Sequence, residues 1–178
     1  MIKLKSILLE IDNESDLDAL AYKFGYTIKD IYHGTSEKFY SFKHDIPKNV
    51  IANDNNNVIY ATDSKEEARS AGNPKRSNSI VMKLYGKMET PFIIDAKGTE
   101  KNRSFGEIGY QKFIKIAKSK GCDGAIIKNV IDFGDVPQTT YIFFNNRNVK
   151  LSGVTIDNTG VSIPLEKRFD SSNADLRY

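Results

Sequence analysis

In two segments of the chain, residues 4–24 and 110–120, apolar residues recur at the three- and four-residue steps of an amphipathic helix. The first such pattern spans residues 4–24, where the segment NESD can divide it into two pieces and Gly25 ends it. The second spans residues 110–120 and is ended by Gly121. Its apolar side consists of Phe113, Ile114, Ile116 and Ala117. The sequence therefore predicts two helices that each pack one side on a core.

Short runs rich in β-branched and aromatic residues predict strands between these helices. The expected strands are residues 28–33, 58–62, 80–85, 92–95, 124–127 and 139–144. The second of them runs into Asp63 and Ser64, and Glu66 or Glu67 follows at the spacing of a capping box, so a helix should begin there.

Connections account for the remaining segments. We expect an exposed loop at 97–108, a turn-rich connection at 130–138 and an extended arm at 152–178. Because the strands do not alternate regularly with helices, the pattern favours an α+β fold over a doubly wound sheet.

The composition excludes several kinds of site and protein class, but it says little about the fold. The chain has 178 residues and a formal net charge of +3, which is too balanced to indicate a nucleic-acid-binding protein by itself. One cysteine, Cys122, excludes an internal disulfide, and with only two histidines a Cys/His zinc cluster is excluded as well, so we expect no metal. No apolar run reaches the length of a membrane span, and acidic residues soon follow the N-terminal lysines, so we expect a cytoplasmic protein without a signal peptide.

Polar residues gather where the expected strands end, and such loops often carry function. They are His33-Gly34-Thr35, the run from Tyr60 to Ser64, the run from Asp132 to Gln138, and Asn145 to Asn148. Each also has a purely structural interpretation. His33 can bond a backbone carbonyl, Tyr60 can pack in the core, Asp63 and Ser64 can cap a helix, and Asp132 and Asp135 can shape a turn. Cys122 is more typical of a small half-buried residue than of a nucleophile.

Four sequence blocks together resemble a known family. The blocks YHGT, IYATDSKEEARS, GCDGAIIKNVIDFGD and YIFFNNRNVKLSG are similar to the ADP-ribosyltransferase domain in polyvalent proteins of phages and mobile elements. The tail, VSIPLEKRF followed by NADLRY, resembles the segment that often closes such proteins. The resemblance begins near residue 30, which suggests an N-terminal helical segment at 1–29, a catalytic domain at 30–151 and a C-terminal arm at 152–178.

The resemblance implies a split, mostly antiparallel β-core with flanking helices that binds NAD⁺ as co-substrate. His33 would then bond the ribose hydroxyls, Gly34 would bring its backbone to the nicotinamide carboxamide, and Tyr60 would stack on the nicotinamide. The cofactor-binding residues implied are His33, Gly34, Thr35, Tyr60, Thr62 and Ser64.

The resemblance also implies cleavage at C1′ of the nicotinamide ribose through a transition state like an oxocarbenium ion, which a carboxylate stabilises. The family commonly places a glutamate on the last core strand, but the run from Pro137 to Tyr141 has no acid. We expect Asp132 to be the acid, followed by Asp135, while Gln138 supplies an uncharged hydrogen bond. Together with His33 these are the candidate catalytic residues.

The resulting hypothesis is an NAD⁺-dependent mono-ADP-ribosyltransferase, a phage or mobile-element effector that modifies a host protein or nucleic acid. Two alternatives stay open at this point. One is an NAD glycohydrolase, in which water replaces the acceptor. The other is a catalytically silent module that binds a nucleotide or a host protein.

Overall fold

The computed structural model describes residues 14–36, 39–41, 58–72, 80–100, 110–132, 134–153 and 155–178. The first part of the expected N-terminal helix, and most of the loop expected at 97–108, lie outside the described residues.

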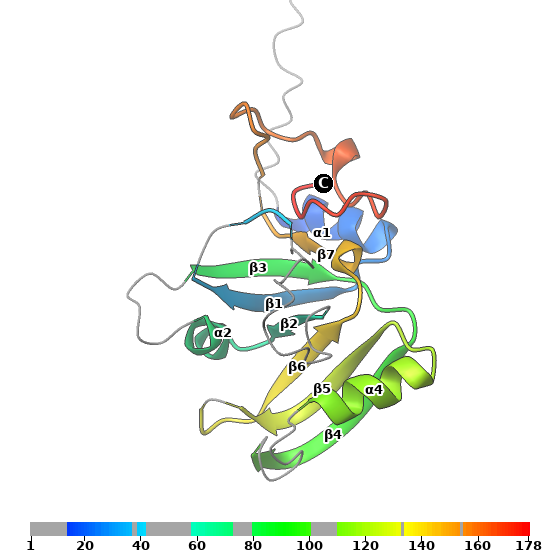
Figure 1. Ribbon diagram of the computed structural model, residues 1–178. Helices are drawn as coiled ribbons and strands as arrows, with labels where there is room; N and C mark the ends of the chain where they lie inside the picture. Colours follow the sequence, from blue (N-terminus) through cyan, green and yellow to red (C-terminus); the bar gives the residue numbers. More distant parts are fainter. Residues whose placement is uncertain are drawn as a thin grey trace, which may run out of the picture.

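Seven strands form one sheet in the order β4-β5-β6-β2-β1-β3-β7. They are β1 (Ile28–Thr35), β2 (Ile59–Thr62), β3 (Ile80–Gly86), β4 (Pro91–Glu100), β5 (Gly124–Ile131), β6 (Gln138–Phe143) and β7 (Val149–Leu151). Every pairing is antiparallel except that of β4 with β5. In Figure 1 β1 and β3 run across the direction of β4, β5 and β6, so the sheet has two differently oriented halves. The expected α+β fold with a split, mostly antiparallel core is confirmed.

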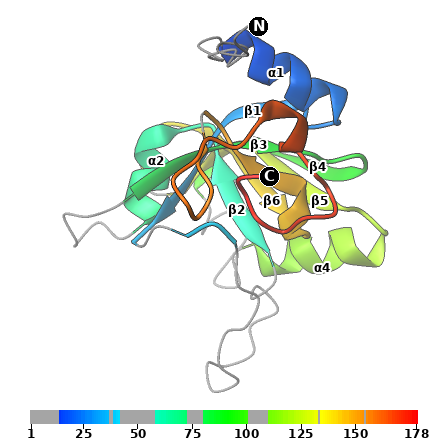
Figure 2. The ribbon, with the colours of Figure 1, turned by 90° about the horizontal axis from the view of Figure 1, so that it is seen from above.

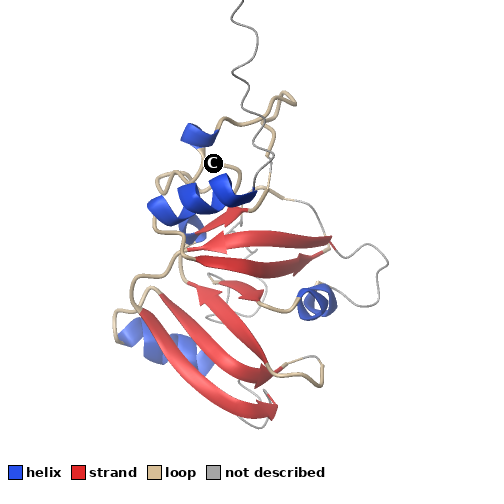
Figure 3. Cartoon of the chain, turned by 180° about the vertical axis from the view of Figure 1, so that it is seen from behind, coloured by secondary structure: helices blue, strands red, loops and turns tan. Residues whose placement is uncertain are grey.

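Three α-helices flank this sheet in the described part of the chain: α1 (Glu14–Lys23), α2 (Lys65–Ala71) and α4 (Gln111–Ser119). Two short 3-10 helices, η1 (Asn146–Asn148) and η2 (Leu165–Lys167), follow β6 and precede the C-terminus. Helix α4 lies along β5, α2 lies beside β1 and β2, and α1 lies near β7 with the C-terminal segment (Figures 1 and 2). Figure 3 shows the reverse side, where the strands of both halves are visible between these helices.

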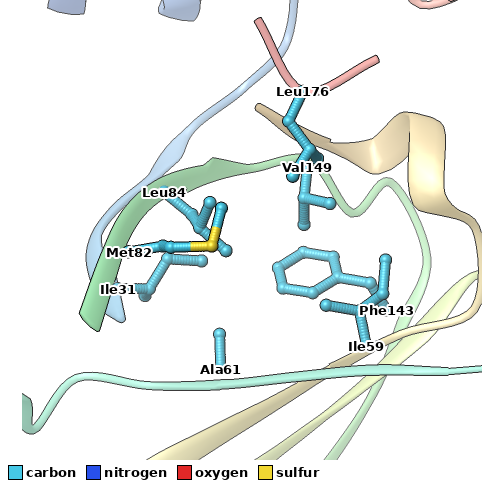
Figure 4. Packing of buried hydrophobic residues seen from close by; sticks show 8 residues of the cluster. All are labelled: Ile31, Ile59, Ala61, Met82, Leu84, Phe143, Val149 and Leu176. Atoms are coloured by element: carbon cyan, nitrogen blue, oxygen red, sulfur yellow. The ribbon is translucent and has the colours of Figure 1, made fainter. Parts of the chain in front are cut away.

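Two hydrophobic clusters fill the two sides of the sheet. The first packs Phe143 and Val149 with Ile31 and Leu84, and Figure 4 shows Ile59 and Ala61 of β2 directed into it. The second lies under α4 and contains Ile114, Ala117, Ala125, Ile127 and Ile142, with Tyr60 packed against it. A third, smaller cluster joins α1 to Tyr26, Tyr85 and Phe169. Alternate residues of β2 therefore enter different clusters, as the period of a strand requires.

Several strands are longer than the sequence indicates. Residues 97–100 were expected in a loop, but they continue β4 and pair Thr99 with Val130 and Glu100 with Ile131 of β5. The same pairing corrects the expected turn at 130–131. Lys97 and Gly98 have positive φ and mark an irregularity that interrupts the register before pairing resumes. Strand β1 runs on to Thr35, so His33 lies inside the strand, and β7 had no expected counterpart.

The C-terminal segment from residue 155 to residue 178 packs closely on the body. Leu176 has no exposed surface and joins the first cluster, while its backbone N–H donates to Tyr40 O at 2.7 Å. Lys150 Nζ donates to the carbonyls of Asn173 and Asp175 at 2.7 and 3.1 Å. The division into segments at residues 29/30 and 151/152 stays a prediction. No helix in the described ranges combines the length and the apolar character that crossing a membrane requires.

Candidate functional site

His33 is held in place by the neighbouring strand. Its Nδ1 lies 2.7 Å from Tyr60 O, and its ring meets the edge of Phe39 at a centroid distance of 5.9 Å. A carbonyl accepts, so Nδ1 carries the proton in this contact. Burial lowers the pKa of the imidazole, and the bond to Tyr60 O opposes that shift only in part. His33 is therefore a neutral ring of fixed orientation near pH 7.

The close packing of α2 against β1 requires a glycine at position 34. A Cβ at this position would lie 1.6 Å from Ala68 O of α2, so no side chain fits there. Gly72, just after α2, also lies close to β1, because a Cβ at this position would be 2.8 Å from Thr35 N. The backbone of α2 and the backbone of Gly34 therefore touch, and the expected contact of Gly34 with a carboxamide stays a prediction.

Tyr60 and Tyr110 form an aromatic pair on the α4 side of the sheet. Tyr60 is paired with Ile142 in the β2–β6 register, and both belong to the packing around the second cluster. Its ring centroid lies 6.0 Å from that of Tyr110, the residue before α4. Burial, helped by the negative charge of Asp132, raises the pKa of Tyr60 to about 12. Tyr60 stays protonated at neutral pH.

The hydroxyl of Tyr110 connects three elements. It donates to Asp132 Oδ2 at 3.0 Å, just beyond the end of β5, and lies 3.4 Å from Thr140 Oγ1 of β6. Burial is the main cause of the raised pKa of Tyr110, and the charges of Asp132 and Glu67 add to it. The phenol therefore keeps its proton and fixes one carboxylate oxygen of Asp132.

Gln138 brings an unused donor to the same side of the sheet. It begins β6, two residues before Thr140, and alternation directs both side chains to the side that carries Ile142 and α4. The side chain is only 7% exposed, yet Nε2 is buried without a hydrogen-bond partner. A buried amide donor left unpaired costs about 1–3 kcal/mol, so this group requires an explanation.

Thr62 and Ser64 have structural roles that the sequence allowed for. Ser64 is the N-cap of α2, and its Oγ accepts from Glu67 N at 3.2 Å. Its own backbone N–H donates to Thr62 Oγ1 at 3.1 Å. Asp63 instead ties β2 to β6, because its Oδ1 accepts from Thr139 N at 2.8 Å. The expected helix start after β2 is confirmed, with Ser64 as the cap.

The two candidate acids, Asp132 and Asp135, have different surroundings in the structure. Asp132 is half-buried and bonded to Tyr110, whereas Asp135 is exposed, next to Val136, whose relative exposure is 73%. Asp132, Gln138, Tyr60 and Thr62 lie on one side of the sheet. His33 shares its side of β1 with the buried Ile31 of the first cluster, and it reaches Tyr60 through the backbone oxygen.

Two members of the site were missed from the sequence: Tyr110 and Thr140. Tyr110 looks like the first residue of a packing helix. Tyr110 and Asp132 are 22 positions apart, so no local pattern links them. The only available signal for Thr140 was its position in the strand where the resemblance places an acid.

Comparison with known proteins gives one family. The model of the ADP-ribosyltransferase domain in polyvalent proteins matches residues 27–160, which is about three quarters of the chain. No curated protein and no solved structure matches the chain.

Proposed function

The chain belongs to the family of ADP-ribosyltransferase domains found in polyvalent proteins, and we propose that it is an NAD⁺-dependent mono-ADP-ribosyltransferase. We further propose that it is an effector of a phage or mobile element, and that it modifies a host protein or nucleic acid in the host cytoplasm. The family relationship supports the transfer of ADP-ribose.

The observation that carries the NAD⁺ assignment is the unpartnered amide of Gln138. Gln138 begins β6 two residues before Thr140, whose Oγ1 lies 3.4 Å from the Tyr110 hydroxyl, and the buried Nε2 of Gln138 has no partner. A ribose hydroxyl or carboxamide oxygen is the kind of acceptor that satisfies such a donor. The residues present therefore fit a polar ligand with oxygen acceptors at this point.

The surroundings suit the nicotinamide end of NAD⁺ in particular. Nicotinamide in NAD⁺ is a flat cation, and the half-buried ring of Tyr60 lies beside Tyr110, which bonds the carboxylate of Asp132. His33 lies on the other side of the sheet, and its proposed contact with the ribose rests on the family relationship. Its Nδ1 is bonded to Tyr60 O, so Nε2 carries the lone pair that a ribose hydroxyl can donate to.

The proposed chemistry requires little beyond orientation and charge. The bond between C1′ and the nicotinamide nitrogen breaks, and its electron pair neutralises the pyridinium, so that nicotinamide leaves uncharged. Asp132, fixed by the Tyr110 hydroxyl, stabilises the positive charge that develops on the ribose. An acceptor atom then forms a bond to C1′ and loses its proton.

The direct test is incubation of the purified protein with labelled NAD⁺ and host lysate. A labelled macromolecule is the expected result. Release of free ADP-ribose alone would identify an NAD glycohydrolase. Absence of both turnover and NAD⁺ binding would leave only a silent binding module.

A matched pair of variants tests the site within the same assay. Asp132→Asn should lower nicotinamide release by about 100-fold or more, because it removes a charge aimed at the transition state. Asp135→Asn changes the same chemical group three residues away on an exposed turn and should leave the rate unchanged. A larger loss with Asp135→Asn than with Asp132→Asn would contradict the proposed acid.

A further inference from the structure

Two contacts orient the ring of His33, and the second of them is with Phe39. The Nδ1 atom of His33 lies 2.7 Å from Tyr60 O, and the His33 ring lies edge-to-face with that of Phe39, with centroids 5.9 Å apart and an interplanar angle of 76°. A single hydrogen bond fixes one ring nitrogen but lets the ring tilt about it. An aromatic pair at this separation has a preferred geometry, so Phe39 restricts the tilt. Phe39 therefore helps to set the direction of Nε2, the nitrogen proposed to accept from the ribose.

The chain at Phe39 is held by the C-terminal segment. Phe39 packs against the first cluster, of which Leu176 is a fully buried member. Leu176 N donates to Tyr40 O at 2.7 Å, and Cζ of Arg177 lies over the Tyr40 ring, 4.1 Å from its centroid. A guanidinium over an aromatic ring at this distance is a stabilising contact. Two consecutive residues near the end of the chain, both beyond the range that the family model matches, therefore hold the neighbour of Phe39.

The guanidinium of Arg177 is fixed by other groups of the same segment, and the residue is only 6% exposed. Its Nε donates to both carboxylate oxygens of Asp175 at 3.0 and 3.2 Å, and Nη2 donates to one of them at 2.7 Å. Its Nη1 donates to Asn158 Oδ1 at 2.9 Å and to Ile156 O at 3.2 Å. These bonds use N–H groups in the guanidinium plane and leave its face for stacking on Tyr40. Arg177 is therefore a fixed support for the Tyr40 ring.

We propose that Arg177 is a positioning residue of the candidate NAD⁺ site. Because it stacks on Tyr40, it holds Phe39 against the His33 ring and so fixes the nitrogen that accepts from the ribose hydroxyl. This inference rests on the proposed function, and it extends the site to a part of the chain that the family match does not reach. Arg177 acts through Tyr40 and Phe39 on the binding of NAD⁺, and it takes no part in breaking the bond to nicotinamide.

The test compares Arg177→Gln with Arg168→Gln. Arg168 is also a buried arginine of this segment, but its guanidinium bonds Gly153 O and Leu151 O, so its variant is a matched control for lost anchoring. Titration with NAD⁺ gives Kd, and nicotinamide release gives KM and kcat. Arg177→Gln should raise Kd and KM by about fivefold, the effect of one neutral hydrogen bond, while kcat changes by less than about twofold. Arg168→Gln should leave all three values unchanged.

Nuclear magnetic resonance of the His33 ring gives a readout that does not depend on catalysis. The chain has two histidines, so comparison with His33→Asn assigns the ring protons of His33. An aromatic ring held against an imidazole shifts the resonances of the imidazole protons. Arg177→Gln and Tyr40→Leu should both move these resonances, whereas Arg168→Gln and Tyr40→Phe should not. Tyr40→Leu leaves the hydrogen bonds of Arg177 in place, so it tests the stacking even where Arg177→Gln lowers the thermal stability of the protein.

The outcomes separate this inference from the proposed function. If the wild-type protein does not bind NAD⁺, the proposed function fails and the inference fails with it. If the wild-type protein binds NAD⁺ but the His33 resonances stay in place in Arg177→Gln and Tyr40→Leu, only the inference is overturned. Moved resonances with an unchanged Kd, or equal losses of affinity in Arg177→Gln and Arg168→Gln, would overturn it as well. Moved resonances and weaker NAD⁺ binding that are confined to Arg177→Gln and Tyr40→Leu support it.

Discussion

Two regions of this molecule bury charged and polar side chains, and they do so differently. Around the C-terminal segment the buried groups are cations that donate to main-chain carbonyls. Lys150 bonds Asn173 O and Asp175 O, and Arg168 bonds Leu151 O and Gly153 O. Around Tyr110 the buried or half-buried groups are an acid, two phenols and an amide, and Gln138 Nε2 has no partner.

The difference indicates what each region does. Carbonyl groups at fixed positions can anchor a chain segment. Lys150 Nζ and the Nη1 and Nη2 atoms of Arg168 donate to such carbonyls, while Arg168 Nε is buried without a partner. The Tyr110 region instead holds a carboxylate bonded to a phenol, and an amide donor, Gln138 Nε2, that has no partner. Buried cations bonded to carbonyls therefore anchor the C-terminal segment, whereas the unpaired amide is the group that we propose a ligand satisfies.

The largest expected effect on stability comes from Leu176→Ala in the C-terminal region. Leu176 is fully buried in the first cluster, so the substitution should lower the free energy of unfolding by about 2–5 kcal/mol. Urea denaturation measures this loss. Val161→Ala, at a position in the same segment with 60% exposure, is the control and should have little effect. Equal losses for both variants would show that the segment does not anchor through its buried side chain.

A pH titration tests the anchoring cation. Burial lowers the pKa of Lys150 to about 8, with Arg168 and Arg147 adding to the shift and Asp170 and Asp175 opposing it. In the unfolded chain this lysine stays protonated up to about pH 10.5. Between pH 8 and pH 10.5 the unfolded chain therefore binds more protons than the folded chain. Relative to Lys150→Met, the stability of the wild-type protein should therefore rise from pH 8 to 10.5, by at most about 3 kcal/mol. Parallel curves for the two proteins would contradict the shift.

The smallest expected effect comes from Gln138→Leu in the site. Replacing an unpaired buried amide by an apolar side chain of similar size should leave stability unchanged or raise it by about 1 kcal/mol. The same variant should bind NAD⁺ more weakly, because it removes the donor proposed for the ligand. Denaturation and binding measurements on one preparation give both values. A clear loss of stability with normal binding would assign Gln138 to the fold rather than to the site.

The sequence predicted the elements whose signals are local. The apolar side of α4, the N-cap at Ser64 and the glycine after each of α1 and α4 were all readable from short spacings. The end of β4 and the whole of β7 were not, because residues 97–100 and 149–151 become strands only through pairing with β5 and β3. Pairing energy from a distant strand outweighs weak local propensity.

The candidate site divides in the same way. The sequence by itself determined that His33, Tyr60, Asp132 and Gln138 are polar groups at or near strand ends, and the resemblance gave them a common chemistry. Only the tertiary structure decided that Asp132 is bonded to Tyr110 while Asp135 is exposed, and that Gln138 lacks a partner. It also decided that Ser64 N, at the start of α2, donates to Thr62 Oγ1. These outcomes depend on distances between residues far apart in the chain, and such distances follow from how the strands and helices pack, which no local spacing encodes.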